Sequence, residues 1–129
     1  MRVFLVRHAD AERGDPDELR VLSEKGRSQS RELGRRFAHD GIRPAAILTS
    51  PLVRARETAD EIALATGTLA EPDQRLAPGA TADDLVAAVA GRGDPIVVVG
   101  HQPDCGQIAT ALTGEEPDFP TAGVFVLNL

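Results

Sequence analysis

The sequence of 129 residues is poor in aromatic side chains: they make up 3% of the chain, and there is no Trp and no Tyr. Few side chains are therefore available to stack on bases or sugar rings. The formal net charge is −6, whereas binding to a phosphate backbone requires a basic surface. Both observations argue against nucleic-acid binding, and an anionic ligand would need a local basic pocket.

Cysteine and long apolar stretches are equally scarce. Cys105 is the one cysteine, so no internal disulfide is possible, and we expect the protein to work in the reducing cytoplasm. The apolar stretch after Met1 covers only residues 3–6, too short for a signal peptide or a membrane span. No second Cys or His stands at ligand spacing near Cys105. We therefore predict no membrane attachment, no metal site and no cofactor.

Hydrophobic residues nonetheless make up 42% of the chain, enough for the core of one ordinary domain. We predict a single domain over residues 1–129 and a monomer. Residues 3–6, 45–48 and 96–99 are apolar runs without polar alternation, which is typical of strands covered on both faces. Residues 123–129 predict a last strand, with Val124 and Val126 facing one way and Phe125 and Leu127 the other.

Helix signals separate these runs. Four helix starts are marked by an N-cap residue or a proline, at Ser23, Pro51, Thr81 and Pro103. The start at Thr81 is strengthened by Asp84, which completes a capping box. The alternation of buried strands with helices predicts an α/β fold, a three-layer sandwich with a mostly parallel central sheet flanked by helices.

Polar side chains follow each of the three buried runs. Arg7 and His8 follow the first, Ser50 follows the second with Arg54 one turn into the next helix, and His101 follows the third. Ligands of open α/β sheets bind at the carboxyl ends of the strands. If the strands are parallel, we expect these five side chains to meet in one pocket.

Two guanidiniums, two imidazoles and a hydroxyl suit a phosphoryl group. Arg7 and Arg54 offer forked donors that match phosphate oxygens, and Ser50 is either a further donor or a plain helix N-cap. A neutral imidazole attacks phosphorus and forms a phosphohistidine, and nearby arginines lower the imidazole pKa and favour that neutral form. The second imidazole would stabilise the transition state, although spacing alone leaves open which histidine attacks.

Four blocks of sequence occur in an order that resembles a known family. They are Val-Arg-His-Ala-Asp (6–10), Leu-Ser-Glu-Lys-Gly (22–26), Thr-Ser-Pro-Leu-Val-Arg-Ala-Arg-Glu-Thr (49–58) and Val-Gly-His (99–101). They resemble the motifs of the histidine phosphatase superfamily, which includes the phosphoglycerate mutases. The resemblance implies a minimal phosphoglycerate mutase-like fold, a phosphate pocket of Arg7, His8, Arg54 and His101, and His8 as the nucleophile.

The short chain, the Arg-His-Ala-Asp-Ala start and the Gly-His-Gln-Pro block resemble most the SixA-type phosphohistidine phosphatases. Asp10 and Gln102 are expected, with Ser50, to contact the substrate. Two departures stand out. Ala9 replaces the family's glycine, which requires that its φ is not positive, and residues 74–81 hold no carboxylate where larger members carry a general acid.

The missing acid favours a substrate with a P–N bond, because imidazole leaves more easily than an alkoxide. The sequence thus predicts a metal-independent phosphatase whose partner is a phosphorylated protein, either a phosphohistidine carrier or a phosphotransfer domain. Two alternatives stay open. One is an enzyme that hydrolyses a small phosphate ester, and the other is a non-catalytic module that binds phosphate or a phosphoprotein.

Overall fold

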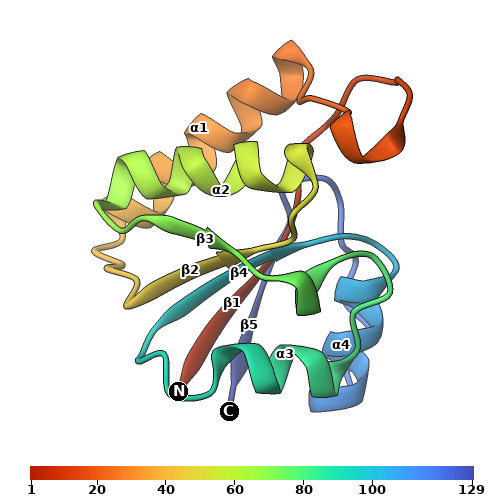
Figure 1. The fold of residues 1–129 in the computed structure, drawn as a ribbon. Helices are drawn as coiled ribbons and strands as arrows, with labels where there is room; N and C mark the ends of the chain where they lie inside the picture. The colour runs from red at the N-terminus through yellow and green to blue at the C-terminus, as the bar shows by residue number, and fades with distance from the viewer.

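The computed structural model describes residues 1–129, which form a five-stranded sheet between two helical layers (Figure 1). The strands and helices in chain order are β1 (Arg2–Arg7), α1 (Glu24–His39), β2 (Ala46–Thr49), α2 (Val53–Thr66), β3 (Ala70–Pro72), α3 (Ala82–Val89), β4 (Ile96–Gly100), α4 (Asp104–Thr113) and β5 (Val124–Asn128). Two short 3₁₀ helices, η1 (Asp17–Leu19) and η2 (Gln74–Leu76), lie in the connections. The predicted three-layer α/β sandwich is confirmed.

The strands lie in the order β3-β2-β4-β1-β5. Neighbouring pairs among β1 to β4 are parallel, and β5 pairs antiparallel with β1 at the edge of the sheet. The sequence did not predict β3, which forms the opposite edge and is largely exposed. It therefore carries no hydrophobic run that would mark it as a strand.

Alternate residues of the buried strands serve two separate cores. Val3 and Leu5 of β1 face the core beneath α3 and α4, whereas Phe4 and Val6 face the core beneath α1 and α2. Residues 96–99 of β4 divide between the cores in the same way. Figure 1 shows the two helix pairs on opposite faces of the sheet. Burial on both faces explains why these strands show no polar alternation.

The predicted helix starts are largely confirmed. Ser23 caps α1 and accepts the N–H of Gly26 at 3.0 Å, and the capping box at the start of α3 is formed. The start of α2 was placed too early: the helix begins at Val53, after an extended Leu52. Ser50 accepts the N–H of Leu52 at 3.3 Å, so the Ser-Pro pair makes a turn of its own before the helix.

The strand register brings the ends of β1, β2 and β4 level. Arg7 pairs with Gly100, and Thr49 pairs with Val99. The residues that follow these pairs therefore emerge at one edge of the sheet. None of the helices combines the length and the apolar character needed to cross a membrane.

Candidate active site

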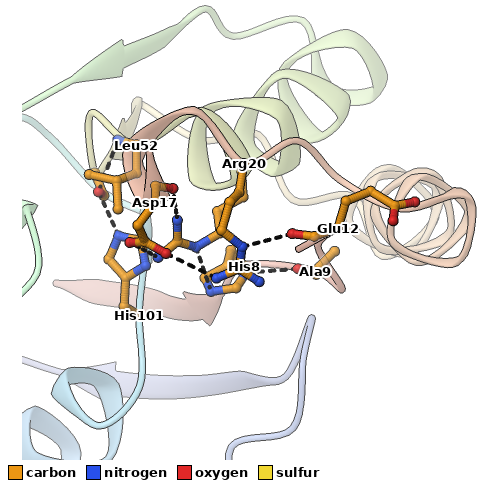
Figure 2. Close-up of polar contacts among 9 residues, drawn as sticks. His8, Ala9, Glu12, Asp17, Arg20, Leu52 and His101 are labelled. Atoms are coloured by element: carbon orange, nitrogen blue, oxygen red, sulfur yellow. Dashed lines mark hydrogen bonds and ion pairs between the residues drawn. The ribbon is translucent and has the colours of Figure 1, made fainter. Parts of the chain in front are cut away.

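His8 and His101 lie side by side at the carboxyl edge of the sheet. Their ring centroids are 5.2 Å apart and the rings are inclined at 58°. The N–H of His8 donates to the Gly100 carbonyl at 3.0 Å, which continues the pairing of β1 with β4 for one more residue. Two histidines 93 positions apart in the sequence therefore meet because two adjacent parallel strands end together (Figure 2).

The hydrogen bonds of His8 fix its tautomer. Its Nδ1 lies 2.7 Å from the Ala9 carbonyl oxygen, which can only accept a hydrogen bond, so Nδ1 carries the ring hydrogen. The lone pair is then on Nε2, which accepts from Nε–H of Arg54 at 3.4 Å. The unprotonated ring nitrogen, Nε2, is thus directed at the Arg54 guanidinium, a group that binds phosphoryl oxygens.

Burial keeps both rings neutral. It lowers the pKa of His8 to about 4, against the opposing effect of the Ala9 carbonyl and with the help of Arg54 and Arg7. Burial is also the main cause that lowers the pKa of His101 to about 3, followed by His8 and Arg54. Near neutral pH, His8 therefore has an unprotonated Nε2, which is the form that a nucleophile requires.

His101 is held by Ser50. The Ser50 hydroxyl lies 2.7 Å from Nε2 of His101 and is fully buried. The buried Ser50 hydroxyl has no acceptor other than Nε2 of His101, so it donates its hydrogen there, accepts the Leu52 N–H and leaves the ring hydrogen on Nδ1. Nδ1 is buried and has no hydrogen-bond partner. It is therefore a free donor beside His8.

The two arginines contribute differently. Arg7 donates from Nη1 to the Phe119 carbonyl at 2.9 Å, while its buried Nε has no partner. Arg54 is 7% exposed, and its terminal nitrogens contact Asp17, with Nη1 2.9 Å from the carbonyl oxygen and Nη2 3.2 Å from the carboxylate. Buried polar groups normally find partners, so the unpaired Arg7 Nε and His101 Nδ1 are both donors left for a ligand such as an oxyanion.

Thr58 of α2 holds the backbone next to His8. Its hydroxyl accepts the Ala9 N–H at 3.0 Å and donates to the Arg54 carbonyl at 2.9 Å. The backbone of Ala9, whose carbonyl fixes the tautomer of His8, is thus anchored to α2 through its N–H. Ala9 is fully buried and its φ is not positive, because Ala122 is the one non-glycine residue with positive φ. An alanine is therefore compatible with the backbone at this position.

The two other expected substrate contacts lie at helix N-termini. The Asp10 carboxylate accepts the Ser23 hydroxyl at 2.6 Å, at the start of α1. Gln102 is exposed, and its Oε1 accepts the Gly106 N–H at 2.7 Å in the first turn of α4. None of their hydrogen bonds joins the cluster around His8. The structure therefore brings together Arg7, His8, Ser50, Arg54 and His101, whereas Asp10 holds the N-cap residue of α1 and Gln102 caps the first turn of α4.

Sequence reasoning missed Asp17 and Arg20. Besides contacting Arg54, Asp17 accepts from Nη1 of Arg20 at 3.1 Å, and Arg20 also donates to the Glu12 carbonyl at 2.7 Å. The η1 segment has no buried residue, so no hydrophobic pattern could have placed it at the site. The structure contains no group of three or more His, Cys, Asp or Glu side chains that could hold a metal ion.

Comparisons with known proteins agree with this geometry. Residues 3–78 match the model of the histidine phosphatase superfamily, branch 1. The whole chain aligns with the structure of the protein histidine phosphatase SixA complexed with tungstate, at a TM-score of 0.90 and 28% identity, and covers 88% of that chain. The protein therefore belongs to the histidine phosphatase superfamily, and its structure is of the SixA type.

Two relatives by sequence show how far the likeness extends. An uncharacterised protein of Picosynechococcus is 34% identical over 99% of this chain and 85% of its own length. The mitochondrial serine/threonine-protein phosphatase Pgam5 of Drosophila persimilis is 41% identical over 61 residues, which are 46% of this chain and 21% of the fly protein. The family supports phosphatase activity, and the match to the fly phosphatase is confined to one part of each chain.

Proposed function

We propose that this protein is a metal-independent phosphatase that removes the phosphoryl group from phosphohistidine on a partner protein, with His8 as the nucleophile. The observation that carries the proposal is the state of His8: a neutral ring with its hydrogen on Nδ1 and the Nε2 lone pair directed at Arg54. A nucleophile next to a donor for phosphoryl oxygens is the arrangement that covalent phosphoryl transfer requires.

The reaction has two steps. In the first, Nε2 of His8 attacks phosphorus, the bond from phosphorus to the substrate nitrogen breaks, and its electron pair stays with the leaving imidazole. In the second, water attacks the phosphorus of phospho-His8 and gives up a proton to solvent, the bond from phosphorus to Nε2 breaks with its electron pair returning to Nε2, and inorganic phosphate leaves. Arg7, Arg54 and Nδ1–H of His101 donate to the phosphoryl oxygens in both transition states, where their charge-assisted hydrogen bonds are strongest.

The choice of phosphohistidine rests on how the leaving group departs. An alkoxide leaving group needs a proton donor, whereas imidazole leaves without one when its far nitrogen is already protonated. Residues 74–81 contain no carboxylate that could protonate an alkoxide. Tungstate, which accompanies the similar SixA structure, is a tetrahedral oxyanion like phosphate and fits the same kind of pocket. The single buried cysteine keeps the cytoplasm as the compartment we propose.

The proposal is tested by phosphate release, with a chelator present, from a phosphohistidine carrier protein and from p-nitrophenyl phosphate. Replacing the nucleophile, His8→Ala, should lower turnover by about 10⁴-fold or more. His39→Ala is the matched control, because His39 is exposed at the end of α1. Rapid acid-free quenching should trap an alkali-stable phosphohistidine on wild type and not on His8→Ala.

Each outcome has a defined meaning. Turnover that depends on His8 and strongly favours the carrier supports the proposal. A preference for the ester would make the protein a small-molecule phosphomonoesterase. A stable complex with the phosphorylated carrier and no phosphate release would make it a binding module.

A further inference from the structure

Asp17 is the acidic side chain that the fold brings to the phosphate pocket. Its two carboxylate oxygens contact two different arginines, Arg20 at 3.1 Å and Arg54 at 3.2 Å, and its carbonyl oxygen accepts a third hydrogen bond from Arg54 at 2.9 Å. The η1 segment contributes no buried residue to the core. These polar contacts therefore hold Asp17 where Figure 2 shows it, beside the rings of His8 and His101.

Asp17 differs from the other charged groups around the two imidazoles in the sign of its charge. Among the charged groups with the largest effect on the pKa of His8 or His101, Arg7, Arg20 and Arg54 are cationic and Asp17 is the single carboxylate. A pocket that only had to bind a phosphoryl dianion would gain nothing from a negative charge at this position. A negative charge is useful if another part of the substrate is positive.

Asp17 is poorly suited to be a general acid. Its hydrogen bonds, from Arg20 first and also from Arg54, lower its pKa below the usual value for aspartate. It is therefore ionised near neutral pH and can accept a hydrogen bond but not supply a proton. Its side chain is 56% exposed, so the carboxylate stays accessible while it contacts Arg54.

We propose that Asp17 selects substrates whose phosphoryl group leaves from a cationic nitrogen heterocycle, by accepting a hydrogen bond from the far N–H of a phosphohistidine imidazolium. The inference rests on the proposed function and deepens it, because it assigns the specificity to a residue. Each terminal nitrogen of Arg54 uses one N–H on Asp17 and keeps a second for phosphoryl oxygens.

The step balances without a proton donor. The bond between phosphorus and the near nitrogen of the imidazolium breaks, its electron pair stays on that nitrogen, and the new bond forms to Nε2 of His8. The ring leaves as neutral imidazole. Its hydrogen stays on the far nitrogen, and this N–H donates a hydrogen bond to the Asp17 carboxylate. With p-nitrophenyl phosphate the leaving oxygen becomes negative instead, and the same carboxylate repels it.

Asp17→Asn tests this assignment, because it removes the charge and keeps the size of the side chain. Glu18→Gln is the matched control: it removes one charge from the same segment, where Glu18 is exposed and makes no salt bridge. Values of kcat/KM are measured for free phosphohistidine, which has no protein surface to dock, and for p-nitrophenyl phosphate.

We expect Asp17→Asn to lower kcat/KM for phosphohistidine by about tenfold, the size of one charge-assisted hydrogen bond. Turnover of p-nitrophenyl phosphate should stay unchanged or rise, and Glu18→Gln should leave the ratio of the two substrates near that of wild type. A parallel fall for both substrates would overturn the inference, since it would mean that Asp17 only positions Arg54. Wild type that releases phosphate neither from free phosphohistidine nor from the phosphohistidine carrier protein would refute the proposed function itself, whatever the variant does.

Discussion

Thr58 offers a way to separate the stability of the fold from the state of the nucleophile. Thr58→Val keeps the shape of this fully buried side chain but removes the acceptor of the Ala9 N–H. A buried donor without a partner costs about 1–3 kcal/mol. Thr58→Ser keeps the hydroxyl and deletes one buried methyl group, which costs about 1 kcal/mol. The two variants should therefore lose comparable free energy of unfolding.

Their effects on His8 should differ. In Thr58→Val the Ala9 N–H loses its acceptor, so Ala9 shifts away from α2. The Ala9 carbonyl belongs to the next peptide unit, which the Asp10 N–H still ties to Gln29, and the shift weakens its contact with Nδ1 of His8 without abolishing it. We expect kcat to fall about tenfold in Thr58→Val, with little change in Thr58→Ser. The ¹⁵N chemical shifts of the imidazole nitrogens report the tautomer directly. If Thr58→Val retained the wild-type ring shifts and kcat, the chain of contacts from Thr58 through Ala9 to His8 would have no functional role.

Two further predictions concern acid stability and packing. Burial lowers the pKa of His8 to about 4 and that of His101 to about 3, so the unfolded state, with histidine near 6.5, binds more protons below that pH. The free energy of unfolding should thus fall as the pH drops from about 6.5 to about 4. At pH 4.5, His8→Gln should remove roughly 2 kcal/mol of that fall. Urea titrations that show the same dependence of stability on pH for wild type and His8→Gln would contradict this. A Cβ on Gly26 would lie 1.8 Å from the Asp10 carbonyl oxygen, so Gly26→Ala should cost about 3 kcal/mol or more. Thermal melting should show no such loss for Gly14→Ala, where the nearest atom to the new Cβ is 3.8 Å away.

The convergence of the site residues could be predicted from the sequence because periodicity and topology act together. The runs that became β1, β2 and β4 are buried on both faces, and such runs are the strongest signal of a parallel sheet. Once the strands are parallel and in register, His8 and His101 have to emerge at the same edge. Spacing alone left the roles of the two histidines undecided, and the resemblance to the family implied His8 as the nucleophile. The hydrogen bonds of His8 and His101 give a physical difference that agrees with this assignment.

The elements that were missed lack a hydrophobic signal. β3 has three residues at an exposed edge, and it is held by backbone pairing with β2. The η1 segment is held near the pocket by the contacts of Asp17 with Arg54 and Arg20. Backbone pairing at an edge and salt bridges between distant residues leave no periodic pattern in a single sequence.

The carboxylates around the carboxyl edge of the sheet bear on the proposed preference for phosphohistidine. Beside the loop where larger members carry a general acid, the Asp73 carboxylate accepts the N–H of Arg75 at 2.9 Å and pairs with its guanidinium. The Asp104 carboxylate accepts the Gly79 N–H at 2.9 Å, which ties that loop to the start of α4. Both are thus engaged in holding the loop, and Asp17 is ionised. Hydrogen bonds from arginines lower the pKa of Asp17 and of Asp73, so neither of these two carboxylates is placed to protonate an alkoxide, whereas the Asp17 carboxylate is ready to accept the N–H of an imidazolium.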